Sequence, residues 1–252
     1  PLTDDELPVK DVLKKEYEYY RSDFYELPKA EELVENFKSE LPTLKSVVLN
    51  TNCEDTNVVL GKKSKPLFGD GYITDILCDV KVKISPLSFY QVNRNGAERL
   101  YNKAAEYACL TGNEDILDLY CGTGTIGIVA SDKAKEVIGV ELNEQAVRDA
   151  KVNARLNGTE NIRFFAADAG KFMVEAARAN EKFDLVFMDP PRAGSDLNFL
   201  RSVVTLSPER IVYVSCNVET QARDLTYLCK NGYRVKKIQP VDMFPHTNHV
   251  ES

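Results

Sequence analysis

From Glu114 to the end of the chain, short runs of β-branched and aromatic residues alternate with helical stretches. Six of these runs are predicted strands, at residues 115–120, 136–141, 161–166, 183–188, 210–215 and 233–240. Residues 144–157 have the apolar spacing of an amphipathic helix, and Gly158 is a typical helix stop. Strands that alternate with helices indicate βαβ units, so we predict an α/β fold with a parallel, doubly wound, Rossmann-like sheet.

The first third of the chain has a different pattern. It suggests a helix at residues 29–39 and strands at 44–50, 57–60 and 76–84, with turn residues between them. We therefore expect a smaller α+β domain over residues 1–85. A helical lead at residues 93–110 then opens the second domain, residues 86–252.

Composition narrows the class of protein. The 252 residues carry a formal charge of −7, and no apolar run approaches the roughly 20 residues that span a bilayer. Six cysteines without a C-x-x-C pair are typical of reduced thiols, so we predict a cytoplasmic protein, which we expect to be a monomer. The two histidines, His246 and His249, lack further ligands nearby, so no metal site is predicted.

A glycine-rich turn follows the first strand of the predicted sheet. Gly122, Gly124 and Gly127 match the G-x-G-x-x-G spacing of a dinucleotide site, which stays open as an alternative. The next strand ends in Glu141, from where a carboxylate can hold the hydroxyls of a ribose.

Acidic residues also follow the next two strands. Asp168 comes after the third strand, and the run Asp189-Pro190-Pro191-Arg192 comes after the fourth. An acid after the third strand commonly meets an adenine amino group, and the Asp-Pro-Pro run after the fourth forms a rigid turn aimed at a substrate beside the cofactor. This set resembles the S-adenosylmethionine-dependent methyltransferase fold and favours a methyltransferase over a dehydrogenase.

Cys216 follows the apolar run 211–214 and Ser215, at the exit of a predicted strand. Glu251 lies in the run 246–251. A thiolate can add to C6 of a pyrimidine and make C5 nucleophilic, and a base must then remove the C5 proton. Cys216 and Glu251 suit these two roles. Cys216 could instead be a core thiol and Glu251 a solvated carboxylate, and an amino-directed methyltransferase would use Asp189-Pro190-Pro191 without a cysteine.

Five motifs between Gly69 and the end of the chain resemble those of the bacterial RNA (uracil-5-)-methyltransferases, in the same order. They are residues 88–93, 117–124, 189–194, 212–217 and 242–251. The resemblance implies a class I methyltransferase sheet, with Cys216 as nucleophile and Glu251 as base. It also implies an S-adenosylmethionine site lined by Gln91, Tyr120, Thr125, Glu141 and Asp189, to which the turn adds Gly122 and the fold adds Asp168.

The implied partner is RNA. The run Asp242-Met243-Phe244-Pro245-His246-Thr247 is more similar to the ribosomal RNA members, so 23S ribosomal RNA is expected to be the substrate. The alternatives are a transfer RNA uracil-5-methyltransferase and a catalytically silent module that binds the cofactor or RNA. Gln91 and Asn93 could also cap the helix that follows them.

Two features of the family are not visible in this sequence. Many members carry an N-terminal oligonucleotide-binding barrel, and some hold an iron-sulfur cluster through four cysteines. A final antiparallel strand beside the fifth is also not apparent after Ser252. We therefore expect a gap or an open edge in the sheet, and a poorly held Glu251.

Overall fold

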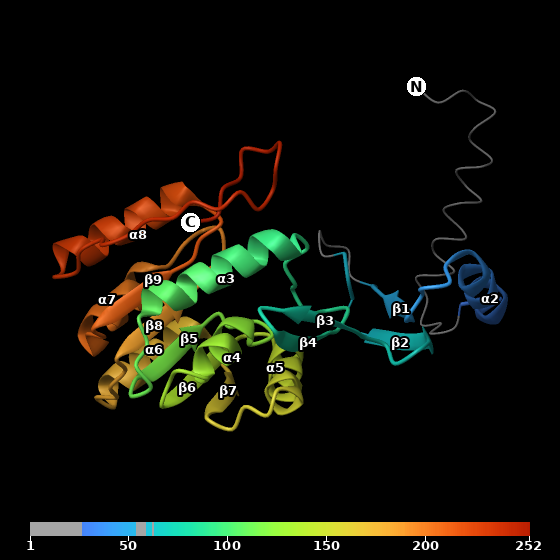
Figure 1. Cartoon of the computed structure of the whole chain (residues 1–252), viewed down its shortest axis with the longest axis horizontal. Coiled ribbons are helices and arrows are strands. Elements are labelled where there is room, and N and C mark those ends of the chain that lie inside the picture. Colours follow the sequence, from blue (N-terminus) through green and yellow to red (C-terminus); the bar gives the residue numbers. More distant parts are fainter. Residues whose placement is uncertain (1–26, 54–58, 62) are drawn as a thin grey trace. The chain divides into compact units, whose positions relative to one another are not determined.

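The computed structural model describes residues 27–53, 59–61 and 63–252 of the chain (Figure 1). Its contacts divide the chain into two compact units, residues 1–73 and 74–252. The division falls between Ile73 and Thr74, earlier in the chain than the boundary at residue 85 that the sequence suggests.

The first unit contains helix α2 (Ala30–Glu40) and the antiparallel strands β1 (Val47–Thr51) and β2 (Lys63–Phe68). The predicted helix at residues 29–39 is confirmed as α2, and the predicted strand at 44–50 corresponds to β1. The first two residues of the predicted strand at 57–60 lie outside the described residues, and its last two belong to no strand.

Strands β3 (Ile73–Leu77) and β4 (Val80–Ile84) pair as a hairpin, so the prediction of one continuous strand at residues 76–84 is wrong. The chain reverses at Cys78 and Asp79, whose φ angles of 52° and 64° match the left-handed turns that join tight hairpins. β4 then docks on helix α5 (Glu144–Leu156), because the Lys83 amide donates to Oδ1 of Asn153 at 2.7 Å.

A parallel sheet of five strands forms the centre of the second unit, in the order β7-β6-β5-β8-β9. The strands are β5 (Asp115–Leu119), β6 (Glu136–Glu141), β7 (Ile162–Ala166), β8 (Leu185–Met188) and β9 (Arg210–Tyr213). Consecutive strands run outward from β5 in one direction and then in the other. This confirms the doubly wound α/β fold, in which ligands bind where the strand order reverses, beyond the carboxyl ends of β5 and β8.

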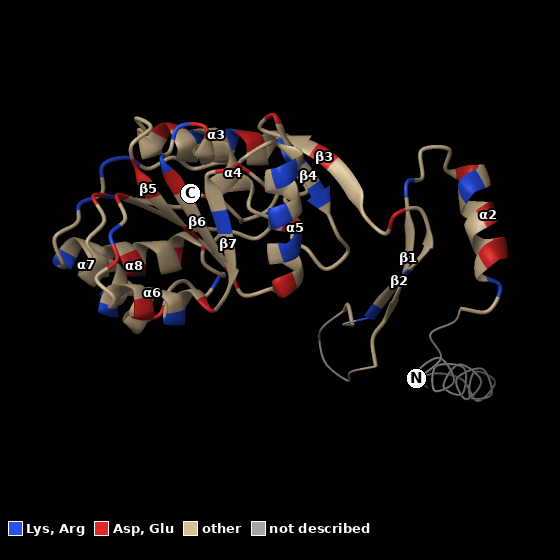
Figure 2. Ribbon diagram, turned by 90° about the horizontal axis from the view of Figure 1, so that it is seen from below, with Lys and Arg blue, Asp and Glu red and all other residues tan. Residues whose placement is uncertain are grey.

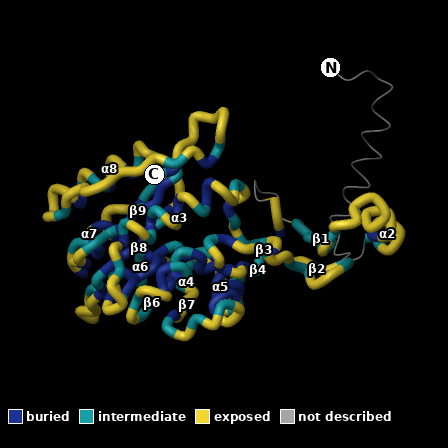
Figure 3. Tube along the Cα trace, viewed as in Figure 1, coloured by how far each residue is buried: buried dark blue, intermediate teal, exposed yellow. Residues whose placement is uncertain are grey.

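Helices cover both faces of this sheet (Figure 2). One face packs against α3 (Arg94–Ala108), α4 (Thr125–Ser131) and α5, and the other against α6 (Ala169–Arg178), α7 (Leu197–Leu206) and α8 (Val218–Lys230). Successive strand residues alternate between the two cores, since Ile116 joins the first and Leu117 the second. The central strands β5 and β8 are therefore buried on both faces, whereas the edge strand β7 is partly exposed (Figure 3).

The predicted sixth strand is wrong, because residues 233–240 form no strand and most of them are exposed. A strand needs a partner for its backbone groups, and a cavity of 720 Å³ lies along this segment instead. Residues of β9, α3 and α8 line the rest of that cavity. Among the described residues, β9 thus has no paired strand on its outer side, which is the open edge expected from the sequence.

None of the helices in the described part of the chain is both long and apolar enough to cross a membrane.

Candidate active site

The glycine-rich turn between β5 and α4 presents bare backbone at the carboxyl edge of the sheet. Gly122 has a φ of 55°, and a Cβ added there would meet no atom within 4 Å. Gly124 has a φ of 81°, and a Cβ there would lie 2.6 Å from the ring of Phe164. Gly124 therefore permits close packing under the turn, whereas Gly122 leaves the backbone accessible to a ligand.

Asp118 supports this turn from beneath. Its Oδ2 accepts the Gly127 amide at 3.0 Å, in the first turn of α4. Burial raises the pKa of Asp118 to about 7, opposed by that hydrogen bond and reinforced by the charge of Glu141. At Gly124 and Gly127, the second and third glycines of the G-x-G-x-x-G spacing, a side chain would collide with Phe164 and Asp118. These two glycines are therefore explained by packing.

Glu141 lies at the end of β6, beside the turn, as the sequence predicts. Its two carboxylate oxygens accept the Gly122 amide at 3.1 Å and the Asn143 amide at 2.8 Å. Asn143 in turn caps α5. The carboxylate is therefore held in place by backbone donors, in reach of a ligand that sits on the turn.

Tyr120 and Asp168 lie further along the same edge. Asp168 caps α6 by accepting the Lys171 amide at 2.9 Å, and a hollow of 310 Å³ is lined by Asp168, Asp196 and Phe199, among others. The ring of Tyr120 lies 5.7 Å from that of Phe199. Burial, then the charges of Asp168, Asp196 and Asp224, raises the pKa of Tyr120 to about 12, so its hydroxyl stays protonated.

The remaining predicted cofactor residues lie before α3 and at the start of α4. Gln91 is buried, and Asn93 is the N-cap of α3, accepting the Gly96 amide at 3.0 Å and donating to the Met243 carbonyl at 2.9 Å. The capping role predicted for Asn93 is confirmed. Thr125 is buried at the first residue of α4.

Asp189 follows β8 and is partly buried. Burial raises its pKa to about 8, and the charges of Glu251 and Asp118 add to the effect. Asp189 is therefore close enough to interact electrostatically with Asp118, beneath the glycine turn, and with Glu251, the predicted base.

Cys216 lies after β9 at the start of α8 and is half-buried. Burial raises the pKa of its thiol, the charges of Glu251 and Asp189 add to this, and the Arg192 guanidinium opposes it. Cys216 is thus under the electrostatic influence of Asp189 and Arg192, which lie in one segment of the sequence, and of Glu251, which lies in another.

Glu251 is only 4% exposed, so the expectation of a poorly held base is wrong. Its backbone pairs with Val241 through hydrogen bonds of 2.8 and 3.1 Å. Burial raises the pKa of its carboxyl, and the Arg192 charge opposes the shift.

Two features of the site have no signal in the sequence. The Arg192 side chain contacts the ring of His249, which brings the turn after β8 to the loop before Glu251. Backbone hydrogen bonds also join Ser215 to Ser252, next to Cys216 and Glu251. Both contacts join distant segments, so only the folded chain reveals them.

Among the residues that the structure describes, no group of three or more histidine, cysteine, aspartate or glutamate side chains could hold a metal ion. The site described above therefore offers a thiol, carboxyl groups and a guanidinium as its chemical groups. These can add a nucleophile to an electrophilic carbon and move protons to and from it.

The family model for tRNA (uracil-5-)-methyltransferases matches residues 29–252. The chain is 47% identical to an uncharacterized RNA methyltransferase of Caldanaerobacter subterraneus subsp. tengcongensis, over 90% of this chain and 50% of that protein. It is also 47% identical to one of Halalkalibacterium halodurans, with the same coverage. The chain spans about half the length of the curated relatives it matches.

Solved structures give the same picture. The Pyrococcus abyssi tRNA (uracil-54, C5)-methyltransferase in complex with S-adenosyl-L-homocysteine is 35% identical, with a TM-score of 0.72 over 85% of this chain and 51% of that one. A putative S-adenosylmethionine-dependent methyltransferase from Streptococcus mutans is 13% identical, with a TM-score of 0.57 over 88% of this chain and 63% of that one, a likeness of fold alone.

Proposed function

Because the chain belongs to the tRNA (uracil-5-)-methyltransferase family, we propose that it transfers a methyl group from S-adenosylmethionine to C5 of a uridine in RNA. The observation that carries the proposal is the backbone pairing of Ser215 with Ser252, which brings Cys216 and Glu251 together within the electrostatic influence of Asp189. A thiol nucleophile and a carboxylate base are the two groups that methylation at a pyrimidine C5 requires.

The residues at the sheet edge fit S-adenosylmethionine. The open backbone at Gly122 admits a ligand, and the carboxylate of Glu141 beside it suits the ribose hydroxyls. Asp168 and Phe199 border the neighbouring hollow, where we propose that the adenine lies, and the ring of Tyr120 is 5.7 Å from that of Phe199. We propose that Gln91, Thr125 and Asp189 complete the lining of this site. When bound, S-adenosylmethionine supplies an electrophilic methyl group.

We propose that Cys216 acts as the nucleophile. Its thiolate forms a bond to C6 of the uracil, and the electrons of the C5–C6 double bond move toward C5 and the O4 carbonyl. C5 can then accept the methyl group. Burial raises the pKa of this thiol and so disfavours the thiolate. The thiol therefore needs a nearby acceptor for its proton, and the positive charge of Arg192 stabilises the thiolate that forms.

We propose that Glu251 acts as the base that completes the reaction. Its carboxylate takes the proton from C5, the C5–C6 double bond forms again, and the bond between C6 and the Cys216 sulfur breaks. The thiolate is thereby regenerated. The burial of Glu251 raises its pKa and so strengthens it as a base.

Within RNA, we propose ribosomal RNA as the substrate, on the basis of the run at residues 242–247. The alternative is transfer RNA, the substrate class in the names of the family and of the Pyrococcus abyssi enzyme. Mapping 5-methyluridine in both RNA classes, from cells with and without this protein, decides between them. Loss from transfer RNA alone would contradict the proposed substrate.

The test of the reaction uses RNA that contains 5-fluorouridine, because fluorine cannot leave C5 as a proton. With S-adenosylmethionine present, the protein is expected to form a stable covalent adduct with this RNA, and Cys216→Ala abolishes it. Cys229→Ala, which changes an exposed cysteine at the far end of α8, is the matched control and keeps the adduct. An adduct that persists in Cys216→Ala would refute the assignment.

A further inference from the structure

Helix α8 holds the loop at residues 190–195, which follows Asp189 and carries Arg192. The Asn217 side-chain amide donates to the Arg192 carbonyl at 3.2 Å. The Thr220 hydroxyl lies 3.3 Å from the same carbonyl and 3.1 Å from that of Asn217. The first turn of α8 therefore holds the backbone of Arg192 against Asn217, the residue that directly follows Cys216.

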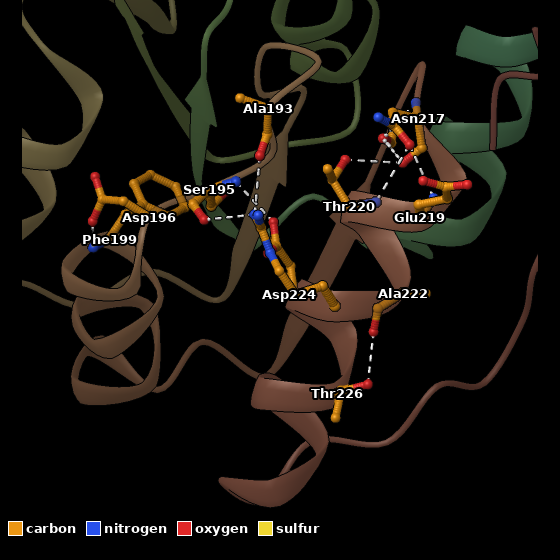
Figure 4. A network of polar contacts seen from close by, with 12 residues as sticks. Ala193, Ser195, Asp196, Phe199, Asn217, Glu219, Thr220, Ala222, Asp224 and Thr226 are labelled. Atoms are coloured by element: carbon orange, nitrogen blue, oxygen red, sulfur yellow. Dashed lines mark hydrogen bonds and ion pairs between the residues drawn. The ribbon is translucent and has the colours of Figure 1, made fainter.

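The next turn of α8 grips the loop further along (Figure 4). Nη2 of Arg223 donates to the carbonyls of Ala193 and Ser195, both at 3.0 Å. Oδ2 of Asp224 accepts the Ser195 amide at 2.7 Å. Arg223 and Asp224 also form an ion pair at 2.7 Å, so the two side chains hold each other as well as the loop.

Asp224 is fully buried, and every donor around it is part of this arrangement. The Tyr213 hydroxyl, at the end of β9, donates to Oδ2 at 2.8 Å, and Nε of Arg223 donates to Oδ1 at 2.8 Å. A buried carboxylate is costly unless it is paired and hydrogen-bonded, so its donors are fixed in position. Asp224 thus connects β9, α8 and the loop after β8 through one carboxylate.

Gly194 shows how closely the loop and the helix approach each other. Its φ is 74°, and an added Cβ would lie 2.5 Å from Nη2 of Arg223, 2.8 Å from Oδ2 of Asp224 and 2.9 Å from Cβ of Thr220. A side chain at this position would separate the loop from α8. The absence of one lets the helix contact the loop backbone directly.

The same helix begins directly after Cys216, since Asn217 is its N-cap. The thiol and the Arg192 loop are therefore attached to one rigid element. We propose that Thr220, Arg223 and Asp224, here called the α8 clamp, are positioning residues that hold Arg192 beside Cys216 and so set the reactivity of that thiol. The inference rests on the proposed function for its catalytic consequence.

The first test is Arg223→Met, which removes the two hydrogen bonds from Nη2 of Arg223 to the loop. Arg201→Met, an exposed arginine on α7, is the matched control. The readout is the pH dependence of Cys216 alkylation by iodoacetamide, followed on the Cys216 peptide by mass spectrometry. We expect the rate at pH 8 to fall about threefold or more in Arg223→Met, because the thiolate loses the nearby positive charge, and to stay unchanged in Arg201→Met.

The second test is milder, so that it remains informative if Arg223→Met does not fold. Thr220→Val removes a hydroxyl that reaches the loop, whereas Thr226→Val removes one that donates only within α8, to the Ala222 carbonyl at 2.7 Å. Thr220→Val is expected to slow the alkylation of Cys216 more than Thr226→Val does, and Thr220→Ser restores it. Equal rates in Thr220→Val and Thr226→Val would overturn the proposal.

Methyl transfer to RNA gives the catalytic readout. For Arg223→Met we expect kcat to fall about tenfold or more while the KM for S-adenosylmethionine stays within about twofold, because only the thiol side of the site moves. If the unaltered protein forms no RNA adduct but the alkylation rates still follow the clamp, the proposed function fails and the clamp stands. If the adduct forms but the clamp variants alkylate Cys216 at the same rate as their controls, the clamp proposal is wrong and the proposed function stands.

Discussion

Ser215 and Ser252 exchange two backbone hydrogen bonds, 2.9 Å from the Ser215 amide to the Ser252 carbonyl and 3.0 Å in the reverse direction. Cys216 directly follows the first of these residues, and Glu251 directly precedes the second. This pairing brings the proposed nucleophile and the proposed base together, although 34 residues lie between them in the sequence (numbers 217–250). The bridge between Val241 and Glu251 holds the same segment from its other side.

Glu251→Gln is expected to stall the reaction after methylation. The amide keeps the shape of the side chain but cannot take the C5 proton, so the covalent RNA adduct accumulates with ordinary uridine. We expect turnover to fall by about 10² or more, the usual contribution of a positioned base. Denaturing gel electrophoresis measures the adduct, and the exposed Glu160→Gln is the control. Unchanged turnover in Glu251→Gln would remove Glu251 from the mechanism.

Asp189→Asn is expected to change how stability depends on pH. Burial raises the pKa of Asp189 to about 8, and that of Asp118 to about 7. The folded protein therefore keeps protons that the unfolded chain releases above pH about 4, and the free energy of unfolding falls as the pH rises from about 4 to about 8. Asp189→Asn removes one of these groups and flattens this decline.

We compare the effect of Asp189→Asn on the free energy of unfolding at pH 8 and at pH 5. We expect this effect to be more favourable at pH 8 by more than about 1 kcal/mol, roughly the value of one pKa unit. Urea unfolding at the two pH values measures the difference. The exposed Asp132→Asn is the control and keeps the pH dependence of the unaltered protein. A decline of the same slope in both variants would show that Asp189 is ionised in the folded protein.

Gly122→Ala is expected to weaken cofactor binding more than it weakens the fold. Gly122 and Gly158 both have positive φ, 55° and 67°, and an added Cβ meets no atom within 4 Å at either position. Each alanine therefore costs about 1–2 kcal/mol of backbone strain. Only Gly122 lies on the proposed ligand turn, so calorimetry with S-adenosylhomocysteine should show an affinity about tenfold lower or worse in Gly122→Ala and little change in Gly158→Ala. Equal affinities would place the ligand elsewhere.

Asn153→Ala is expected to destabilise the second unit. Its side chain is fully buried, with Oδ1 accepting the Lys83 amide at 2.7 Å and Nδ2 donating to the Thr123 carbonyl at 3.0 Å. Removing it leaves both backbone groups without this partner, so we expect a loss of about 2 kcal/mol or more in urea unfolding.

The neighbouring Asn157 makes a similar pair of bonds to the backbone of Lys81, at 2.9 and 2.8 Å. These bonds are exposed, so water can replace them, and Asn157→Ala should cost less than Asn153→Ala. A larger loss in Asn157→Ala would mean that burial does not decide the cost at these positions.

Local patterns were sufficient to predict most of the second unit. Five strands and the helix at residues 144–157 follow from the spacing of apolar residues, which burial on both faces of a sheet or on one side of a helix requires. The exposed turn at Gly122 and the carboxylate at Glu141 follow from their places at strand ends. These features depend on residues that are close together in the sequence.

The wrong predictions concern features that depend on a partner elsewhere. Residues 233–240 have a strand composition but no paired backbone, and residues 76–84 turn back at Cys78 and Asp79, whose side chains carry no strong turn signal for such a hairpin. Glu251 was expected to be poorly held because the final strand that anchors this loop in the family was not apparent in the sequence. In the folded chain, backbone hydrogen bonds between Glu251 and Val241, and between Ser252 and Ser215, hold this segment in place.

Residue patterns along the chain give the chemical groups that this protein carries and the order of the strands that present them. The folded chain adds two relationships: the pairing of Ser215 with Ser252 brings Cys216 to Glu251, and α8 holds the Arg192 loop through Arg223 and Asp224. Both depend on hydrogen bonds and electrostatic interactions, which act over a few ångströms in space. Local residue patterns record what a segment prefers, and these contacts join segments that the chain itself keeps far apart.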